Sequence, residues 1–258
     1  MHSLEHLHEL TVLDLALTQV GDDGVGRLAE MPKLRDLTLM GTRVTDRGIP
    51  HLMQLPALAE LSLGYCQISD EGLAELRGCA GLILLNLEAT RITDEGLRYL
   101  SGLKLLWVVT VDGTSISDTG AEALAQIGSL GFLDANRTSI GDSGARALAA
   151  HPLIRQLRLD DCPVGDEGLA ALATAPSLSY LSLGGTKITD DGLWRFVETS
   201  SVRMLRIYKT AVTDVGLEHL AALPSLQGMV LDDSHFTEAG IKQLQKARPK
   251  LKIQVVND

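Results

Sequence analysis

The chain is poor in aromatic residues and in positive charge, and each shortage bears on the class of protein to which it can belong. Aromatic side chains make up only 3% of its 258 residues, so leucine and alanine carry most of the apolar content. There are 23 lysines and arginines against 33 acidic residues, which gives a formal net charge of -10. Because a sequence-independent grip on nucleic acid needs a cationic face, we expect no nucleic-acid partner.

Long apolar runs and targeting signals are also missing. No stretch approaches the roughly 18 apolar residues of a membrane span. The first eight residues lack the basic start and apolar stretch of a signal peptide. The three cysteines, Cys66, Cys79 and Cys162, suit a reducing compartment as buried thiols. We therefore expect a cytoplasmic protein without a membrane partner.

Motifs that carry chemistry are absent as well. The sequence has no Cys-x-x-Cys pair, no His-Glu-x-x-His helix motif, no phosphate-binding loop and no Gly-x-Ser-x-Gly turn. No nucleophile, base and orienting group can be assembled from what remains. The sequence predicts that the chain is not an enzyme and uses no cofactor and no metal. An enzyme with an unfamiliar site is kept as an alternative, which an activity screen would address.

What the sequence does contain is one motif repeated along its whole length. Asp-x-Gly recurs every 24 residues, from 22–24 to 214–216, and a tenth copy reads Glu-x-Gly at 238–240. No insertion or deletion interrupts the spacing. A fixed period of this length is the signature of a repeat architecture, in which each unit stacks on its neighbours.

Leucines follow the same register and define the elements of one repeat. Leu85 and Leu87 lie two positions apart, which places them on one face of a strand. Leu97 and Leu100 lie three apart, which suits one face of a short helix. Each repeat is therefore predicted to be a strand, a turn, a short helix and a second turn.

The pattern L-x-x-L-x-L-x-x-T-x-I, carried by residues 82–92, resembles the leucine-rich repeat. Within that family it is similar to the ribonuclease-inhibitor-like and cysteine-containing types, and most of all to bacterial 24-residue versions. The resemblance implies an α/β leucine-rich-repeat solenoid, a curved arc with a parallel β-sheet on its concave face and short helices on its convex face. Residues 1–258 are expected to form a single domain of about ten repeats, with a partial repeat at each end.

The column of aspartates allows two interpretations. The Asp, or the Thr or Ser before it, can accept hydrogen bonds from free backbone N–H groups where a helix starts. A row of calcium ligands is the alternative, but the Gly-Gly-x-Gly-x-Asp spacing of calcium-binding repeats is absent. We prefer helix capping, and we expect the glycine two residues later to mark a position without room for a side chain.

Strand residues that alternate with the buried leucines should face the inside of the arc, where partners of this family usually bind. On these strands an apolar strip lies beside acidic residues, with tyrosines and arginines further along, and this composition resembles a binding hot spot. The competing interpretation is that the apolar side chains merely fill gaps between neighbours. The predicted contact residues are Leu84, Glu88, Trp107, Val108, Asp112, Phe132, Asp134, Arg158, Asp160, Tyr180, Arg206 and Tyr208.

The sequence therefore predicts a non-catalytic scaffold that binds a protein partner through its concave face. The acidic row predicts that this partner carries basic groups. An alternative is that the chain is the sensing or substrate-recruiting fragment of a larger signalling or ubiquitin-ligase-like protein. The resemblance makes that alternative plausible, although the sequence itself contains no F-box or kinase signature.

Overall fold

The computed structural model describes residues 8–232 and 235–256, apart from the side chains of residues 198 and 199. The partial repeat expected around Leu4 and Leu7 lies outside the described residues. The chain divides into two compact units. We call them the N-terminal unit (1–116 and 126–130) and the C-terminal unit (117–125 and 131–258). The prediction that residues 1–258 form a single domain stays a prediction.

In the N-terminal unit each short strand is followed by a helix or a 3-10 turn, as the leucine spacing predicts. Each strand pairs in parallel with the next one along the chain. The elements are β1 (Val12–Asp14), α1 (Asp22–Gly26), η1 (Arg27–Glu30), β2 (Asp36–Thr38), η2 (Asp46–Gly48), α2 (Ile49–Leu52), β3 (Glu60–Ser62), α3 (Asp70–Leu76), β4 (Leu84–Asn86), α4 (Asp94–Leu97), η3 (Arg98–Gly102) and β5 (Val108–Thr110).

The C-terminal unit repeats this order with longer helices. Its strands also pair in parallel and in chain order. The elements are α5 (Asp118–Leu124), β6 (Phe132–Asp134), α6 (Asp142–Ala149), β7 (Gln156–Arg158), α7 (Asp166–Ala173), β8 (Tyr180–Ser182), α8 (Asp190–Thr199), β9 (Met204–Arg206), α9 (Asp214–Leu220), β10 (Gly228–Asp232), α10 (Glu238–Ala247) and β11 (Lys252–Val256).

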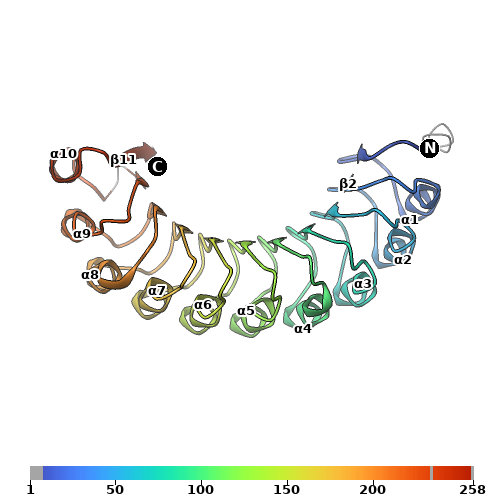
Figure 1. The fold of residues 1–258 in the computed structure, drawn as a ribbon, viewed down its shortest axis with the longest axis horizontal. Coiled ribbons are helices and arrows are strands. Elements are labelled where there is room, and N and C mark those ends of the chain that lie inside the picture. Colours follow the sequence, from blue (N-terminus) through green and yellow to red (C-terminus); the bar gives the residue numbers. More distant parts are fainter. Residues whose placement is uncertain (1–7, 233–234, 257–258) are drawn as a thin grey trace. The chain divides into compact units, whose positions relative to one another are not determined.

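Strand pairing brings equivalent leucines side by side. Leu37 pairs with Leu61, and Leu61 pairs with Leu85, each 24 positions further on, and all three are fully buried. In each unit the helices lie on one side of the strands, and no described helix covers the other side (Figure 1). The predicted fold class, an α/β leucine-rich-repeat solenoid with a parallel sheet, is confirmed.

The preferred interpretation of the aspartates as helix caps holds for the residues before them, not for the carboxylates themselves. Ser69 and Thr93, the residues before two of the aspartates, are the caps, since their hydroxyls accept from backbone N–H groups two residues on, at 3.3 and 3.4 Å. The carboxylate of Asp70 instead reaches into the next repeat. It accepts from the backbone N–H of Thr93 at 2.8 Å and from its hydroxyl at 2.6 Å. The aspartates therefore join successive repeats.

The same contact explains the glycine in eight copies of the motif. In the N-terminal unit a Cβ on Gly48 would lie 2.8 Å from Oδ1 of Asp22 in the preceding repeat. In the C-terminal unit a Cβ on Gly168 would lie 2.6 Å from Oδ1 of Asp142. Such distances are too short for a carbon and an oxygen that are not bonded. The glycine is needed because the carboxylate of the previous repeat occupies the space of a side chain.

Candidate partner-binding surface

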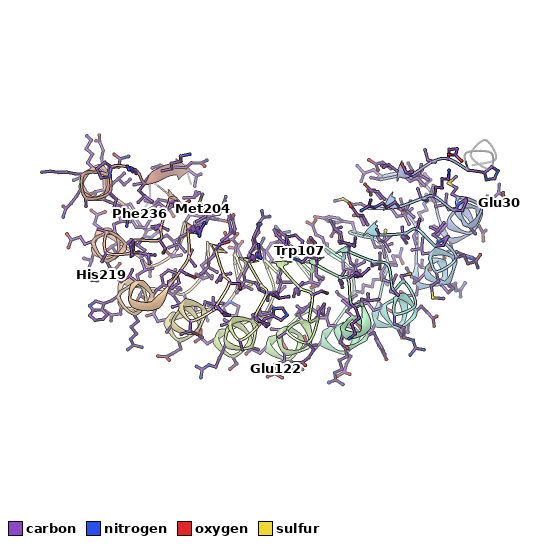
Figure 2. All side chains as sticks on the ribbon, in the orientation of Figure 1. Glu30, Trp107, Glu122, Met204, His219 and Phe236 are labelled. Atoms are coloured by element: carbon purple, nitrogen blue, oxygen red, sulfur yellow. The ribbon has the colours of Figure 1, made fainter. Side chains whose placement is uncertain are left out.

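We call the side of the strands that faces away from the helices the sheet face, and each unit has its own. In the C-terminal unit Met204 lies on the strand side, whereas Glu122 and His219 lie on the helix side (Figure 2). The predicted strip is divided between the units. Leu84 and Val108 belong to the N-terminal unit and Phe132 to the C-terminal unit.

On the N-terminal sheet face, apolar and acidic residues occupy neighbouring strands. Leu84 pairs with Val108 across β4 and β5, and both are half-buried. On the strands before them Asp36 pairs with Glu60. Glu88, which follows β4, accepts a hydrogen bond from the Tyr65 hydroxyl at 2.8 Å. Like charges placed directly opposite each other destabilise a sheet, so the Asp36–Glu60 pair has no obvious structural benefit.

Trp107 lies directly before Val108, the first residue of β5, on the strand side of the ribbon (Figure 2). Its side chain is 41% exposed. The prediction that Trp107 belongs to the contact surface stays a prediction, and Trp107 is an exposed aromatic residue next to the strip.

The C-terminal sheet face gathers aromatic rings around an arginine. The guanidinium carbon of Arg158, on β7, lies 5.2 Å from the centre of the Phe132 ring and 5.7 Å from that of Tyr180. Those rings come from the strands on either side, β6 and β8. Both distances fall within the roughly 6 Å range of a cation–π contact. Arg158 is thus held between two rings while its side chain stays 39% exposed.

A second pair of this kind lies two strands further on. The guanidinium carbon of Arg206, on β9, lies 5.5 Å from the centre of the Tyr208 ring. The Tyr208 ring covers Gly184, where a Cβ would collide with ring carbons. The sequence argument did not single out Gly184. The sequence signal for this contact was a glycine just after a strand, Gly184, with a tyrosine 24 residues later, Tyr208.

The acidic row does not face solvent as predicted. Asp112, Asp134 and Asp160 are only 9%, 9% and 8% exposed. Asp160 accepts from the Ser182 hydroxyl at 2.7 Å and from the Gly184 backbone N–H at 2.6 Å. The prediction of solvent-facing carboxylates was wrong, because side chains and backbone groups of the next repeat cover them, as the partners of Asp160 and Asp134 show. Asp160 is thus a structural anion beneath the arginines.

Asp134 and Arg158 form an ion pair joined by one hydrogen bond. Nη1 of Arg158 donates to Oδ2 of Asp134 at 3.1 Å. Burial raises the pKa of Asp134, and the arginine offsets part of this rise. Burial lowers the pKa of Arg158, but the hydrogen bond and negative charge of Asp134, together with Tyr180, outweigh it, so the net shift is upward. Oδ1 of Asp134 and Nε of Arg158 are buried without a hydrogen-bond partner among the described residues.

Tyr208 stays a hydrogen-bond donor at neutral pH. Burial raises the pKa of its hydroxyl, and the negative charge of Asp160 raises it further. The hydroxyl therefore keeps its proton, because even an unperturbed tyrosine titrates only near pH 10. The C-terminal sheet face thus has two layers, buried carboxylates below and arginine and aromatic side chains above.

The described part of the chain is also predicted to lack metal clusters and membrane-spanning helices. Residues 8–232 and 235–256 contain no group of three or more acidic, histidine or cysteine side chains that could hold a metal ion. Within the same ranges no helix has the length and apolar character that crossing a membrane requires. Cys66, Cys79 and Cys162 are all buried and form no disulfide with one another.

Comparison with known proteins agrees with this geometry. A family model described as Leucine Rich repeat matches residues 2–29, 56–76, 150–173 and 174–193. Internalin C2 of Listeria monocytogenes is 24% identical with a TM-score of 0.61, over 76% of this chain and 80% of its own. A second internalin of that organism, InlF, is 19% identical with a TM-score of 0.54, and the match covers 97% of this chain and 88% of InlF. No curated protein sequence matches the chain.

These observations define the class of the protein. It has the leucine-rich-repeat fold, with strands and helices on opposite sides of each unit. The ribonuclease-inhibitor-like subtype and the 24-residue bacterial version implied by the resemblance stay predictions. So do the contact residues named from the sequence and the absence of enzymatic activity.

Proposed function

We propose that the chain is a non-catalytic scaffold that binds a protein partner through its sheet faces, the surface predicted from sequence to be concave. One observation carries the proposal. Three of the chain's nine aromatic residues, Phe132, Tyr180 and Tyr208, gather around Arg158 and Arg206 on one face of the C-terminal unit. A protein with so few aromatic residues places a third of them where no described helix covers them.

The composition and rigidity of this surface favour recognition. Tyrosine and arginine are enriched among residues that dominate binding energy at protein interfaces. Stacking holds Arg158 in place before a partner arrives, so less side-chain entropy is lost on binding. The cation–π contacts also support the competing interpretation, in which these side chains only pack on each other. Binding experiments with variants separate the two.

The N-terminal sheet face contributes a different chemistry. Asp36, Glu60 and Glu88 are half-buried there, beside the apolar pair of Leu84 and Val108. None of the strand positions facing this way in the described N-terminal unit is a lysine or arginine. We propose that this face takes basic groups of the partner. The proposal no longer includes Asp112, Asp134 and Asp160, whose carboxylates are buried.

The cellular setting is part of the proposal. Three free thiols without a disulfide suit a reducing compartment, which supports the predicted cytoplasmic location. The fold supports a recognition role rather than catalysis by analogy with other repeat proteins that present extended binding surfaces.

The test compares proteins captured from a cell extract by the immobilised wild-type chain and by two variants. Phe132→Ala removes one ring of the C-terminal sheet face, and we expect it to weaken capture of the true partner by about thirtyfold, equivalent to a hot spot of about 2 kcal/mol. Glu122→Ala, on the helix side of α5, is the matched control and should leave capture unchanged.

A thermal melt of each variant accompanies the capture experiment, so that loss of folding is not read as loss of binding. Quantitative mass spectrometry then ranks proteins by the ratio between the two variants. A partner that Phe132→Ala still captures fully, and that Glu122→Ala loses, places binding on the helix side and contradicts the proposal.

A further inference from the structure

We infer that the C-terminal sheet face binds an acidic segment of a protein partner. Two carboxylates of that segment, about 10 Å apart, would pair with Arg158 and Arg206. The inference rests on the proposed function and names the chemistry of the partner for this face. It reverses the prediction made for the chain as a whole, because the charged groups near the surface here are cations rather than the acidic row.

The charge that faces outward is positive because the negative groups are buried and engaged. Asp160 is held by the Ser182 hydroxyl and the Gly184 N–H, and Asp134 by Arg158. Arg206 makes no ion pair with any described residue and lies over Tyr208. Arg206 is half-buried and also interacts with the Tyr208 hydroxyl, but a cation without an acidic partner can still bind a carboxylate.

The orientation of Arg158 leaves donors for a ligand. Its guanidinium carbon lies 5.2 and 5.7 Å from the centres of the Phe132 and Tyr180 rings, and a hydrogen bond with Tyr180 contributes to its raised pKa. One edge nitrogen, Nη1, donates to Asp134, and Nε is buried. Nη1 is the nitrogen that already donates to a carboxylate, so a second carboxylate would be bound through Nη2.

Register sets the distance between the two cations. Arg158 pairs with Ser182, and Ser182 pairs with Arg206, so the arginines occupy the same level on β7 and β9. With about 4.8 Å between neighbouring strands, their backbones are about 10 Å apart. An extended polyproline-type segment rises about 3.1 Å per residue and turns once in three residues. Glutamates three residues apart on such a segment would meet both arginines.

Aromatic side chains at this surface add a second reason to expect an extended segment. Tyr180 and Tyr208 flank the two guanidinium groups, and aromatic surfaces are the usual docking partners of proline-rich segments. Nucleic acid, the other polyanion with regularly spaced charges, is disfavoured by the net charge of -10.

The experiment uses the full chain and two synthetic probes labelled with fluorescein. One probe contains three Glu-Pro-Pro units, and the other contains three Gln-Pro-Pro units of the same length. Fluorescence anisotropy at low salt should show binding of the first probe at least tenfold tighter than that of the second. Raising the salt to about 0.3 M should weaken the first interaction, as expected for charge pairing.

Variants locate the interaction. Arg206→Gln should weaken binding of the glutamate probe at least tenfold. Arg206→Lys should keep only part of the wild-type affinity, because lysine lacks the planar fork of arginine. Arg158→Gln should weaken binding too, but it leaves Asp134 buried without its partner, so Arg206 provides the main test. Arg146→Gln, exposed on the helix side of the same unit, is the control.

Equal binding of the two probes, or full affinity in Arg206→Gln, overturns the inference. Tighter binding of a single-stranded oligonucleotide than of the glutamate probe overturns it as well, in favour of a polyanion site. The proposed function fails separately. If Phe132→Ala abolishes capture of a partner while neither probe binds, the sheet face recognises protein by another chemistry and only the carboxylate inference is lost.

Discussion

The contact between successive repeats gives the sharpest prediction, because one carboxylate both joins two repeats and excludes a side chain. Asp22 accepts from the backbone N–H of Thr45 at 2.8 Å and from its hydroxyl at 2.7 Å. A Cβ on Gly48 would lie 2.8 Å from Oδ1 of Asp22 and 3.0 Å from a methyl of Val44. The two substitutions Asp22→Ala and Gly48→Ala should therefore be strongly coupled.

The expected magnitudes follow from these contacts. Hydrogen bonds to a charged group contribute about 1.5–3 kcal/mol, and water can partly replace these half-exposed ones, so Asp22→Ala should cost about 2 kcal/mol. Gly48→Ala should cost about 1 kcal/mol, since overpacking of about 1–3 kcal/mol is offset by about 1 kcal/mol of helix propensity. Once the carboxylate is absent, Gly48→Ala should be neutral or slightly stabilising.

Urea unfolding followed by circular dichroism measures all four proteins of this double-mutant cycle. We expect the double variant to be more stable than the sum of the single effects by about 1–2 kcal/mol. Asp23→Ala, at the exposed neighbouring carboxylate, should change stability by less than about 0.5 kcal/mol. Effects of Asp22→Ala and Gly48→Ala that add within about 0.5 kcal/mol would refute the account of the glycine.

Four further predictions concern a core leucine, a polar strand residue, a thiol and the domain structure. Leu85→Ala should cost about 2–5 kcal/mol in urea, as for other fully buried leucines, and an effect no larger than that of Asn86→Ala would show the strand facing to be wrong. Asn86→Ala should cost about 1 kcal/mol rather than nothing, since the Asn86 side chain donates to Ser62 at 3.2 Å and accepts from the Glu88 backbone at 2.9 Å. Burial raises the pKa of Cys79 from 9.0 to about 11, so iodoacetamide at pH 8 should alkylate it at least about a hundredfold more slowly in the folded chain than in urea; equal rates would contradict its burial. If residues 1–258 form a single domain, calorimetry should show one unfolding transition, and two separate transitions would contradict that prediction.

The repeat and the buried leucines could be predicted from sequence because a solenoid makes its main contacts between neighbouring repeats. A period of 24 residues places Leu61 beside Leu37 and Leu85 whatever the rest of the chain does. Strand alternation then decides which side chains join the core. The helix caps are equally local, since Ser69 accepts from a backbone group only two residues away.

Tertiary structure alone decided where the polar side chains go. The aspartate that looked like a helix cap reaches the next repeat, because its carboxylate can meet a backbone N–H that becomes adjacent only after stacking. The burial of Asp160 depends on two short residues of the next repeat, Ser182 on β8 and Gly184 in the turn after it. The position of Arg158 depends on rings from both neighbouring strands. Alternation fixes the face to which a side chain belongs, whereas its depth and partners on that face depend on the lengths of several neighbours at once.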